Sequence, residues 1–88
     1  FGLSSQMQRA AVSVPANIAE GVGRNSPKER IQFLAIARGS LTELETHVII
    51  ARELGYTTDI EKLLALIDRV FALLNGLMQA ERRKSAAK

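Results

Sequence analysis

The sequence predicts an all-α protein, and three observations lead to that fold class. Apolar residues recur every three or four positions, which is the period of a helix that buries one face. No segment alternates apolar and polar residues as a half-buried strand does, and proline occurs only at positions 15 and 27. Two helix-start signatures occur, at Ser26 and Thr58. We therefore expect three helices, at about 4–22, 27–54 and 59–83.

The first predicted helix, 4–22, carries an apolar stripe and a polar stripe side by side. One of the two serines that open it is the expected N-cap. Pro15 lacks an amide hydrogen and its ring clashes with the carbonyl four residues back, so we expect a kink in the preceding turn. Both stripes stay in phase across the proline, which favours one kinked helix. Gly21 and Gly23 are expected to end it.

The polar stripe of this helix mixes amide, hydroxyl, carboxylate and guanidinium groups. Either these groups satisfy one another and a neighbouring helix, with Arg9 paired to a carboxylate such as Glu43, or Arg9, Asn17 and Arg24 contact nucleic acid. Glu20 in the same file would repel phosphate, which favours the structural interpretation. The predicted structural polar network consists of Gln6, Arg9, Ser13, Asn17, Glu20 and Glu43.

The second predicted helix, 27–54, has a clear start and stop. Ser26 is followed by proline at the first helical position and then by Glu29, which completes a capping box, and Gly55 follows the helix. A glycine in mid-helix costs about 1 kcal/mol relative to alanine. Close approach of another backbone would explain it, so we expect Gly39 at a helix–helix or subunit contact. An exposed gap that faces a ligand is the alternative.

The third predicted helix, 59–83, follows the second capping box, which begins at Thr58. This helix is apolar around more of its circumference than one antiparallel neighbour needs. Three such helices joined by short turns form a single up-down bundle domain, residues 1–88. Either a fourth helix or other subunits must cover the remaining apolar surface. The chain begins at Phe1 without an initiator methionine, so we expect residues upstream of it.

Basic residues are concentrated around the start of the second helix and at the end of the chain. The whole sequence carries 12 Lys and Arg against 9 Asp and Glu, a net charge of +3. Such residues bind a phosphate backbone without reading its sequence. Only four aromatic residues are present, which leaves little material for base stacking. The candidate nucleic-acid-binding residues are Arg24, Lys28, Arg30, Arg82, Arg83 and Lys84.

The sequence holds no constellation that would support catalysis or metal binding. It has no cysteine, and His47 is its only histidine, so thiolate sites and a histidine pair within one chain are excluded. The glycines before Arg24 follow a helix and lack the Lys-Ser/Thr ending of a phosphate-binding P-loop. We expect a protein that is not an enzyme and needs no cofactor or metal.

The sequence also gives no sign of export or membrane insertion. No signal-peptide pattern is present, and no apolar run approaches the length of a membrane span. The lack of cysteine is compatible with a reducing compartment. We expect a cytoplasmic protein that does not contact a membrane.

Two blocks of the sequence and a short segment near its end carry a resemblance to a known family. The first block is Gln6-Met7-Gln8-Arg9-Ala10-Ala11-Val12-Ser13-Val14-Pro15-Ala16-Asn17-Ile18-Ala19-Glu20-Gly21, followed by Gly23-Arg24. The second block is Phe33-Leu34-Ala35-Ile36-Ala37-Arg38-Gly39-Ser40-Leu41-Thr42-Glu43-Leu44-Glu45, and the short segment is Asn75-Gly76-Leu77. Together they resemble the four-helix-bundle proteins called 23S rRNA-intervening sequence proteins, over nearly the whole chain.

The resemblance implies a fold, an assembly and partners. The three helices would be the second, third and fourth of an antiparallel up-down four-helix bundle whose first helix is missing from this sequence, and five bundles would form a homopentameric ring. Similar accessory proteins of diversity-generating retroelements work with a reverse transcriptase and nucleic acid. The implied partners are therefore other copies of the chain, RNA or DNA, and another protein such as a reverse transcriptase.

Two functions remain open at this point. The chain is either an oligomeric protein that associates with nucleic acid through basic patches repeated by the ring, or a scaffold ring that organises another polypeptide without touching nucleic acid. The basic patches favour the first function. The wide apolar face of the last helix is the main argument for the second.

Overall fold

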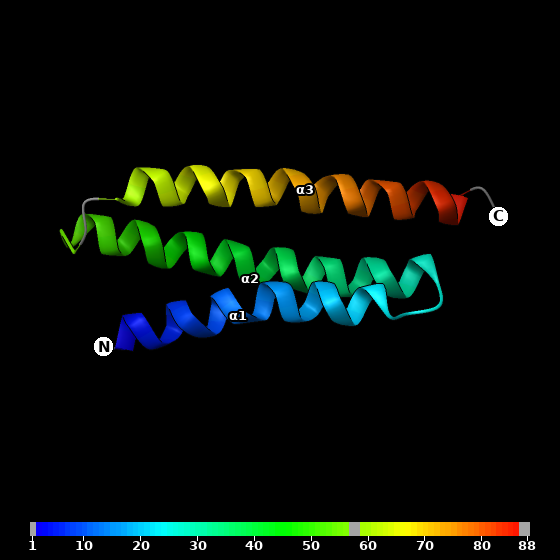
Figure 1. Ribbon diagram of the computed structural model, residues 1–88, viewed down its shortest axis with the longest axis horizontal. Helices are drawn as coiled ribbons and strands as arrows, with labels where there is room; N and C mark the ends of the chain where they lie inside the picture. The colour runs from blue at the N-terminus through cyan, green and yellow to red at the C-terminus, as the bar shows by residue number, and fades with distance from the viewer. Residues whose placement is uncertain (1, 57–58, 87–88) are drawn as a thin grey trace.

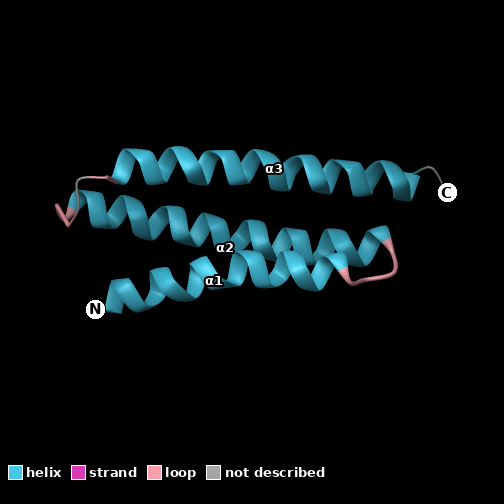
Figure 2. Cartoon of the chain, viewed as in Figure 1, coloured by secondary structure: helices cyan, strands magenta, loops and turns pink. Residues whose placement is uncertain are grey.

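The computed structural model describes residues 2–56 and 59–86. They form the helices α1 (Gly2–Val22), α2 (Pro27–Glu53) and α3 (Ile60–Ala86), which run alternately up and down with α2 in the middle (Figure 1). All regular structure in these residues is helical (Figure 2). The predicted all-α class is confirmed, whereas the described residues contain three helices and not the four of the expected bundle.

The ends of α2 follow from its capping residues. The Ser26 hydroxyl accepts a hydrogen bond from the amide of Glu29 at 3.2 Å, and Pro27 occupies the first helical position. Gly55, with a φ of 73°, takes the left-handed conformation that ends the helix. The predicted helix 27–54 is confirmed to within one residue. The second predicted capping box begins at Thr58, which lies outside the described residues.

The start and end of α1 differ from the prediction. The helix begins at Gly2, so the two serines expected to cap it lie inside its first turns. It passes through Pro15 as one helix and changes direction near its middle (Figure 1). At the other end, Gly21 is buried inside the last turn, where a Cβ would lie 3.0 Å from the Cβ of Phe33. Gly21 therefore allows close packing of α1 on α2, and the helix ends at Val22.

The core forms along α2, which packs against both other helices. The molecule is a flat layer with principal extents of 50 × 21 × 13 Å. Such a layer has two broad faces, and among the described residues α1 and α3 each pack on α2 without packing on each other. The buried apolar residues are Val14 from α1, Leu34, Ala37, Leu41, Val48 and Ala51 from α2, and Ile60, Ile67, Leu74 and Met78 from α3.

One broad face carries apolar hollows between α1 and α3, which we call the α1–α3 groove. One hollow has a volume of about 560 Å³, and its lining includes Met7 and Leu63. A second hollow of about 420 Å³ includes Ile18 and Leu77 in its lining. Leu73 beside it is 67% exposed. This unburied surface agrees with the expectation that the helices carry more apolar surface than three can cover.

The third helix is more apolar than the sequence analysis allowed. By length and composition α3 is long enough to cross a membrane, with a mean hydropathy of 1.5 over 18 residues, which corrects the expectation that no apolar run approaches such a length. Core helices of soluble proteins pass the same test. Asp68 and Arg69 lie near the middle of α3, and each such residue costs about 2.5–3.5 kcal/mol at the centre of a bilayer. The amphipathic packing on α2 therefore explains this helix better.

Candidate functional site

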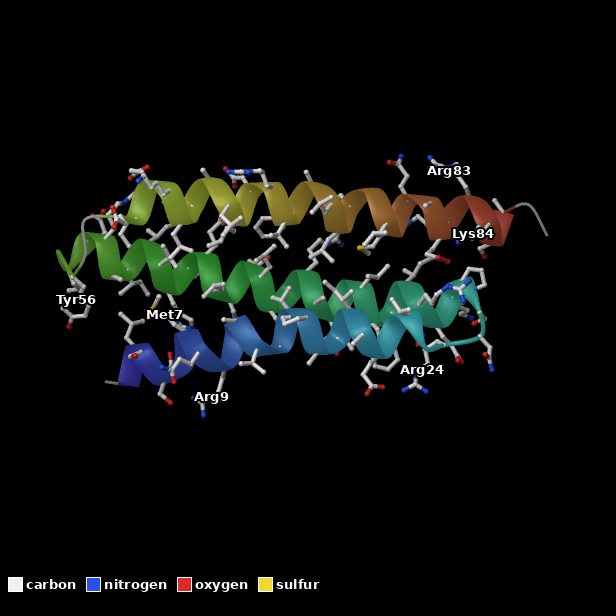
Figure 3. The ribbon with its side chains drawn as sticks, in the orientation of Figure 1. Met7, Arg9, Arg24, Tyr56, Arg83 and Lys84 are labelled. Atoms are coloured by element: carbon white, nitrogen blue, oxygen red, sulfur yellow. The ribbon has the colours of Figure 1, made fainter. Side chains whose placement is uncertain are left out.

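The predicted basic residues meet at one end of the molecule, which we call the turn end. It comprises the connection between α1 and α2, the first turns of α2 and the last turns of α3. Figure 3 shows Arg24 on the connection and Arg83 and Lys84 on α3 at this end. Antiparallel packing brings these segments together although they are separated by more than 50 positions in the sequence.

Arg30 at the turn end is occupied by the fold. Its Nε donates to Oε1 of Glu81 at 2.7 Å, and its Nη1 donates to the carbonyl oxygen of Arg24 at 2.8 Å. The Arg30 side chain is only 23% exposed and that of Glu81 only 10%. This one guanidinium thus ties together α2, the connection and α3. Arg30 is a structural residue, and its charge is already matched.

Glu81 is the acidic centre of the turn end. The hydrogen bond from Arg30 lowers the pKa of its carboxyl group, and Lys84 adds to the effect, while burial opposes it. Lys84 donates from Nζ to Oε2 of Glu81 at 3.2 Å. Two of the predicted nucleic-acid-binding cations therefore share one carboxylate. A phosphate would have to compete with Glu81 for either of them.

Arg24 is held by two weaker contacts on the surface. Its Nη2 lies 3.2 Å from Oε2 of Glu20, one turn earlier in α1, and its guanidinium carbon lies 4.6 Å from the centre of the Phe33 ring. Exposed ion pairs contribute about 0–1 kcal/mol, so Arg24 can exchange this carboxylate for another anion. Stacking on Phe33 keeps the guanidinium oriented meanwhile.

Lys28, Arg82 and Arg83 are the unmatched cations of the turn end. All three are exposed, and within residues 2–56 and 59–86 none of them forms an ion pair. The six predicted residues therefore divide into three groups. Arg30 and Lys84 contact Glu81, and Arg24 contacts Glu20. The third group, Lys28, Arg82 and Arg83, remains available to a polyanion.

Part of the predicted polar network forms a hydrogen-bonded contact between α1 and α2. The hydroxyl oxygens of Ser13 and Ser40 lie 2.7 Å apart, and Ser40 is buried. The Nδ2 of Asn17 donates to the Ser13 hydroxyl at 3.0 Å and to the Ser13 carbonyl at 2.9 Å. Since buried hydroxyls require partners, this contact fixes how the two helices align.

Beyond this contact the two helices border an open polar hollow of about 430 Å³, lined in part by the exposed residues Gln6, Arg9 and Glu43, which we call the α1–α2 cavity. Because the helices are antiparallel and Ser13 faces Ser40, Arg9 lies opposite Glu43 and Gln6 lies opposite His47. Neither Arg9 nor Glu43 forms an ion pair with any described residue. The expected pair between them is therefore not formed, although both residues line the same cavity.

Two further predicted positions lie outside this network. Glu20 is on the surface and contacts Arg24, so it belongs to the turn end. Gly39 is exposed, and nothing lies within 4 Å of the position that its Cβ would occupy. The expected helix–helix contact at Gly39 is therefore wrong within the described chain, and a subunit contact remains a prediction.

The sequence analysis missed three residues that shape these sites. Glu81 lacked any visible partner because the arginine it contacts is distant in the sequence. Ser40 was not assigned a role, and His47 was considered only as a metal ligand. With Glu43 they have the same spacing of three and four positions as Gln6, Arg9 and Ser13. Two matching polar patterns on antiparallel helices were the signal that could have revealed the α1–α2 cavity.

The chemistry available at these sites is that of binding. Among the described residues no group of three His, Cys, Asp or Glu side chains could hold a metal ion. The turn end offers cations, and the α1–α2 cavity offers hydroxyl, amide, imidazole and two opposite charges. Among the described residues, the Ser13 and Ser40 hydroxyls bond to each other, the Ser13 hydroxyl also accepts from Asn17, and neither hydroxyl bonds to His47 or Glu43.

A flat layer of three antiparallel helices with a basic end is the class of protein that the fold and the turn end define. The model of the 23S rRNA-intervening sequence protein family matches residues 1–76, so the chain belongs to that family, and the resemblance is confirmed. This family is not known as an enzyme family. Among curated proteins, none matches the chain significantly.

Proposed function

We propose that this chain is a non-enzymatic, oligomeric helical-bundle protein that associates with RNA or another nucleic acid through the turn end. The observation that carries the proposal is the set of exposed, unmatched cations Lys28, Arg82 and Arg83, beside a weakly held Arg24. Contacts of this kind bind phosphates and do not discriminate between bases.

A single turn end would bind nucleic acid weakly. Three or four cations release few counterions, and such binding weakens as salt rises. Repetition of the patch in a ring of five subunits would raise the apparent affinity by increasing the effective concentration of sites. The proposal therefore includes a homopentamer, as the family resemblance implies.

The proposal also includes a fourth helix that completes the bundle. The α1–α3 groove supports it, because one more amphipathic helix laid along the groove would cover Leu73 and Leu77, which are 67% and 48% exposed. Burial of apolar surface contributes about 25 cal/mol per Å². We place the assembled protein in the cytoplasm, without membrane contact, cofactor or metal.

One measurement tests this function. The protein is titrated into a fluorescently labelled RNA oligonucleotide across a series of KCl concentrations, and its mass in solution is recorded at each concentration. We expect an oligomer whose affinity falls steeply as salt rises. Absence of RNA binding at low salt, or tight RNA binding whose affinity does not change with salt, would contradict the proposal. A mass in solution equal to that of a monomer would contradict the ring, and the basic patch would then not be repeated.

The alternative function is a scaffold ring that organises another protein, such as a reverse transcriptase, with no direct contact to nucleic acid. The exposed leucines on α3 favour it, since large exposed apolar patches mark protein-interaction sites. Recovery of a specific protein from the native host after nuclease treatment would support this alternative. Loss of all captured partners on nuclease treatment would support the nucleic-acid function instead.

A further inference from the structure

The backbone of Arg24 is fixed at the turn end. Its amide donates to the carbonyl oxygen of Gly21 at 3.0 Å, and its own carbonyl oxygen accepts from Nη1 of Arg30 at 2.8 Å. Figure 3 shows Arg24 and Arg83 on opposite sides of the turn end. The side chain of Arg24 therefore extends from a fixed point, at the side of the turn end that belongs to α1 and its connection.

The guanidinium plane of Arg24 has one covered face and one open face. Its central carbon lies 4.6 Å from the centre of the Phe33 ring, which lies against one face of the plane. Glu20 contacts an edge, because the N–H bonds lie in the plane and Oε2 of Glu20 lies 3.2 Å from Nη2. The Arg24 side chain nevertheless remains 43% exposed. Phe33 and Glu20 thus orient the plane and leave its second face to solvent.

Glu20 distinguishes the two ways in which this arginine can contact nucleic acid. A guanidinium binds a phosphate through its edge and stacks on a base through its face. A phosphate would have to displace the Glu20 carboxylate, which repels it. An uncharged base on the open face leaves that carboxylate in place. The geometry at Arg24 therefore favours a base over a phosphate.

A base can reach this face only when it is unpaired. In a duplex each base is hydrogen-bonded to its partner and stacked between its neighbours, so its faces are not accessible to a protein. In a single strand the bases can be splayed out and stacked on a planar side chain. The open face of Arg24 thus selects the class of nucleic acid.

We propose that the turn end binds single-stranded nucleic acid, with an unpaired base stacked on the open face of the Arg24 guanidinium, opposite Phe33. This inference rests on the proposed function, because Lys28, Arg82 and Arg83 hold the strand by its phosphates. Stacking of this kind accepts any base, since every base has a π-face. The site therefore prefers single strands without reading their sequence.

The experiment compares two labelled RNA strands of equal length and equal phosphate charge. One is an unstructured strand with all its bases, and in the other every base is replaced by an abasic site. Each strand is titrated with the protein at low salt and at several higher KCl concentrations. We expect the complete strand to bind at least about fivefold more tightly, since one stacked base contributes that much or more.

Variants assign the preference to Arg24. Arg24→Lys keeps the charge but lacks the plane, so it should bind both strands with nearly equal affinity. Phe33→Leu removes the ring that orients the guanidinium and should reduce the preference. Arg83→Lys is the matched control, because Arg83 is exposed and lies over no aromatic ring within residues 2–56 and 59–86, and it should keep the preference. Circular dichroism checks that each variant is folded.

The outcomes separate this inference from the function on which it rests. A preference for the complete strand that disappears in Arg24→Lys and persists in Arg83→Lys supports the inference. Equal, salt-dependent binding of both strands by the unchanged protein overturns it and leaves nucleic-acid binding in place. A preference that Arg24→Lys retains, or that Arg83→Lys loses to the same extent, also overturns it. Absence of binding to either strand at low salt contradicts the proposed function and the inference together.

Discussion

At the turn end Arg24, Arg30 and Lys84 find acidic partners, whereas in the N-terminal half of α1 Arg9 forms no ion pair with any described residue. Arg30 reaches both the Arg24 carbonyl and Glu81 at hydrogen-bonding distance. Arg9 and Glu43, with the same pair of functional groups, do not meet. Residue type alone therefore does not decide whether a charge is structural. Its position in the fold decides it, since Arg30 is partly buried against Glu81 whereas Arg9 and Glu43 are exposed.

The two regions differ because of local backbone packing. Near the turn, Gly21 lets α1 approach α2 closely, with no side chain between it and Phe33. Toward the N-terminus of α1, the ribbons of α1 and α2 draw apart in Figure 1. Within the described residues the chain thus pairs Arg30 with Glu81 at the turn end, and it leaves Arg9 unpaired in the N-terminal half of α1. The following predictions test that contrast, from the largest expected effect to the smallest.

Loss of Arg30 should have the largest effect on stability. Arg30→Met leaves the buried Glu81 with Lys84 alone, and we expect a loss of about 3 kcal/mol, the lower end for a broken buried pair. Chemical unfolding followed by circular dichroism measures it. Arg69→Met, at an exposed arginine, should change stability by less than about 0.5 kcal/mol. The double variant R30M/E81M should recover part of the loss, because it leaves no unpaired buried charge. Equal losses of stability for Arg30→Met and Arg69→Met would contradict the structural role of Arg30.

The same pair makes stability depend on acid pH. The folded state lowers the pKa of Glu81 below its usual value of 4.5, so its contribution is fully present above pH 4.5 and is lost as the pH falls through the folded pKa. Glu81→Gln should lower stability at neutral pH and flatten the decline below pH 4.5. Unfolding curves at several acid pH values measure this slope. A decline of unchanged steepness in the variant would show that other carboxylates dominate.

Alanine at two glycines should change stability in opposite directions. In Gly21→Ala the new Cβ meets Phe33 at 3.0 Å, and we expect a net loss of about 1 kcal/mol after the gain in helix propensity is subtracted. Gly39→Ala meets nothing within 4 Å and should gain about 0.5–1 kcal/mol. Melting temperatures of the two variants measure the contrast. A gain at both positions would mean that α1 does not need close packing at Gly21.

The hydroxyl contact between α1 and α2 should contribute less. Ser13→Ala removes the partner of the Ser40 hydroxyl and one of the two acceptors of the Asn17 amide, which keeps the carbonyl of residue 13, and we expect a loss of about 1 kcal/mol in the free energy of unfolding. Ser5→Ala, at an exposed serine of the same helix, is the control and should be neutral. Arg9→Gln should also be nearly neutral, because Arg9 contributes no ion pair to the described chain. If Arg9→Gln lowered the free energy of unfolding as much as Ser13→Ala does, Arg9 would have to contribute to stability, and the contrast between the two regions would be wrong.

Helix positions were predictable because they depend on local signals. The capping box at Ser26 and the glycine at position 55 set the limits of α2, and both signals lie within a few residues of the ends they define. The start of α1 was not predictable in the same way. Ser4 and Ser5 suggested an N-cap, but the helix begins earlier, at Gly2. Serines are therefore also tolerated inside the first turns of a helix.

The candidate sites were only partly predictable, because their partners are distant in the sequence. The basic residues were found as local clusters, yet the division between Arg30 and the unmatched cations depends on Glu81, 51 positions away. The polar stripe of α1 was recognised, and the Ser13–Asn17 contact follows from their spacing of four positions. That Arg9 and Glu43 are both exposed and do not pair depends on how α1 and α2 are turned toward each other, which no local pattern encodes.

The central claim is that the fold uses Arg30 internally and leaves Lys28, Arg82 and Arg83 for a polyanion. The most direct test compares the salt dependence of RNA binding by the protein with that of the triple variant K28Q/R82Q/R83Q. We predict that the slope of log affinity against log salt falls in magnitude by about 2 per subunit, from three lost phosphate contacts at about 0.7 each. An unchanged slope in the triple variant would contradict the account.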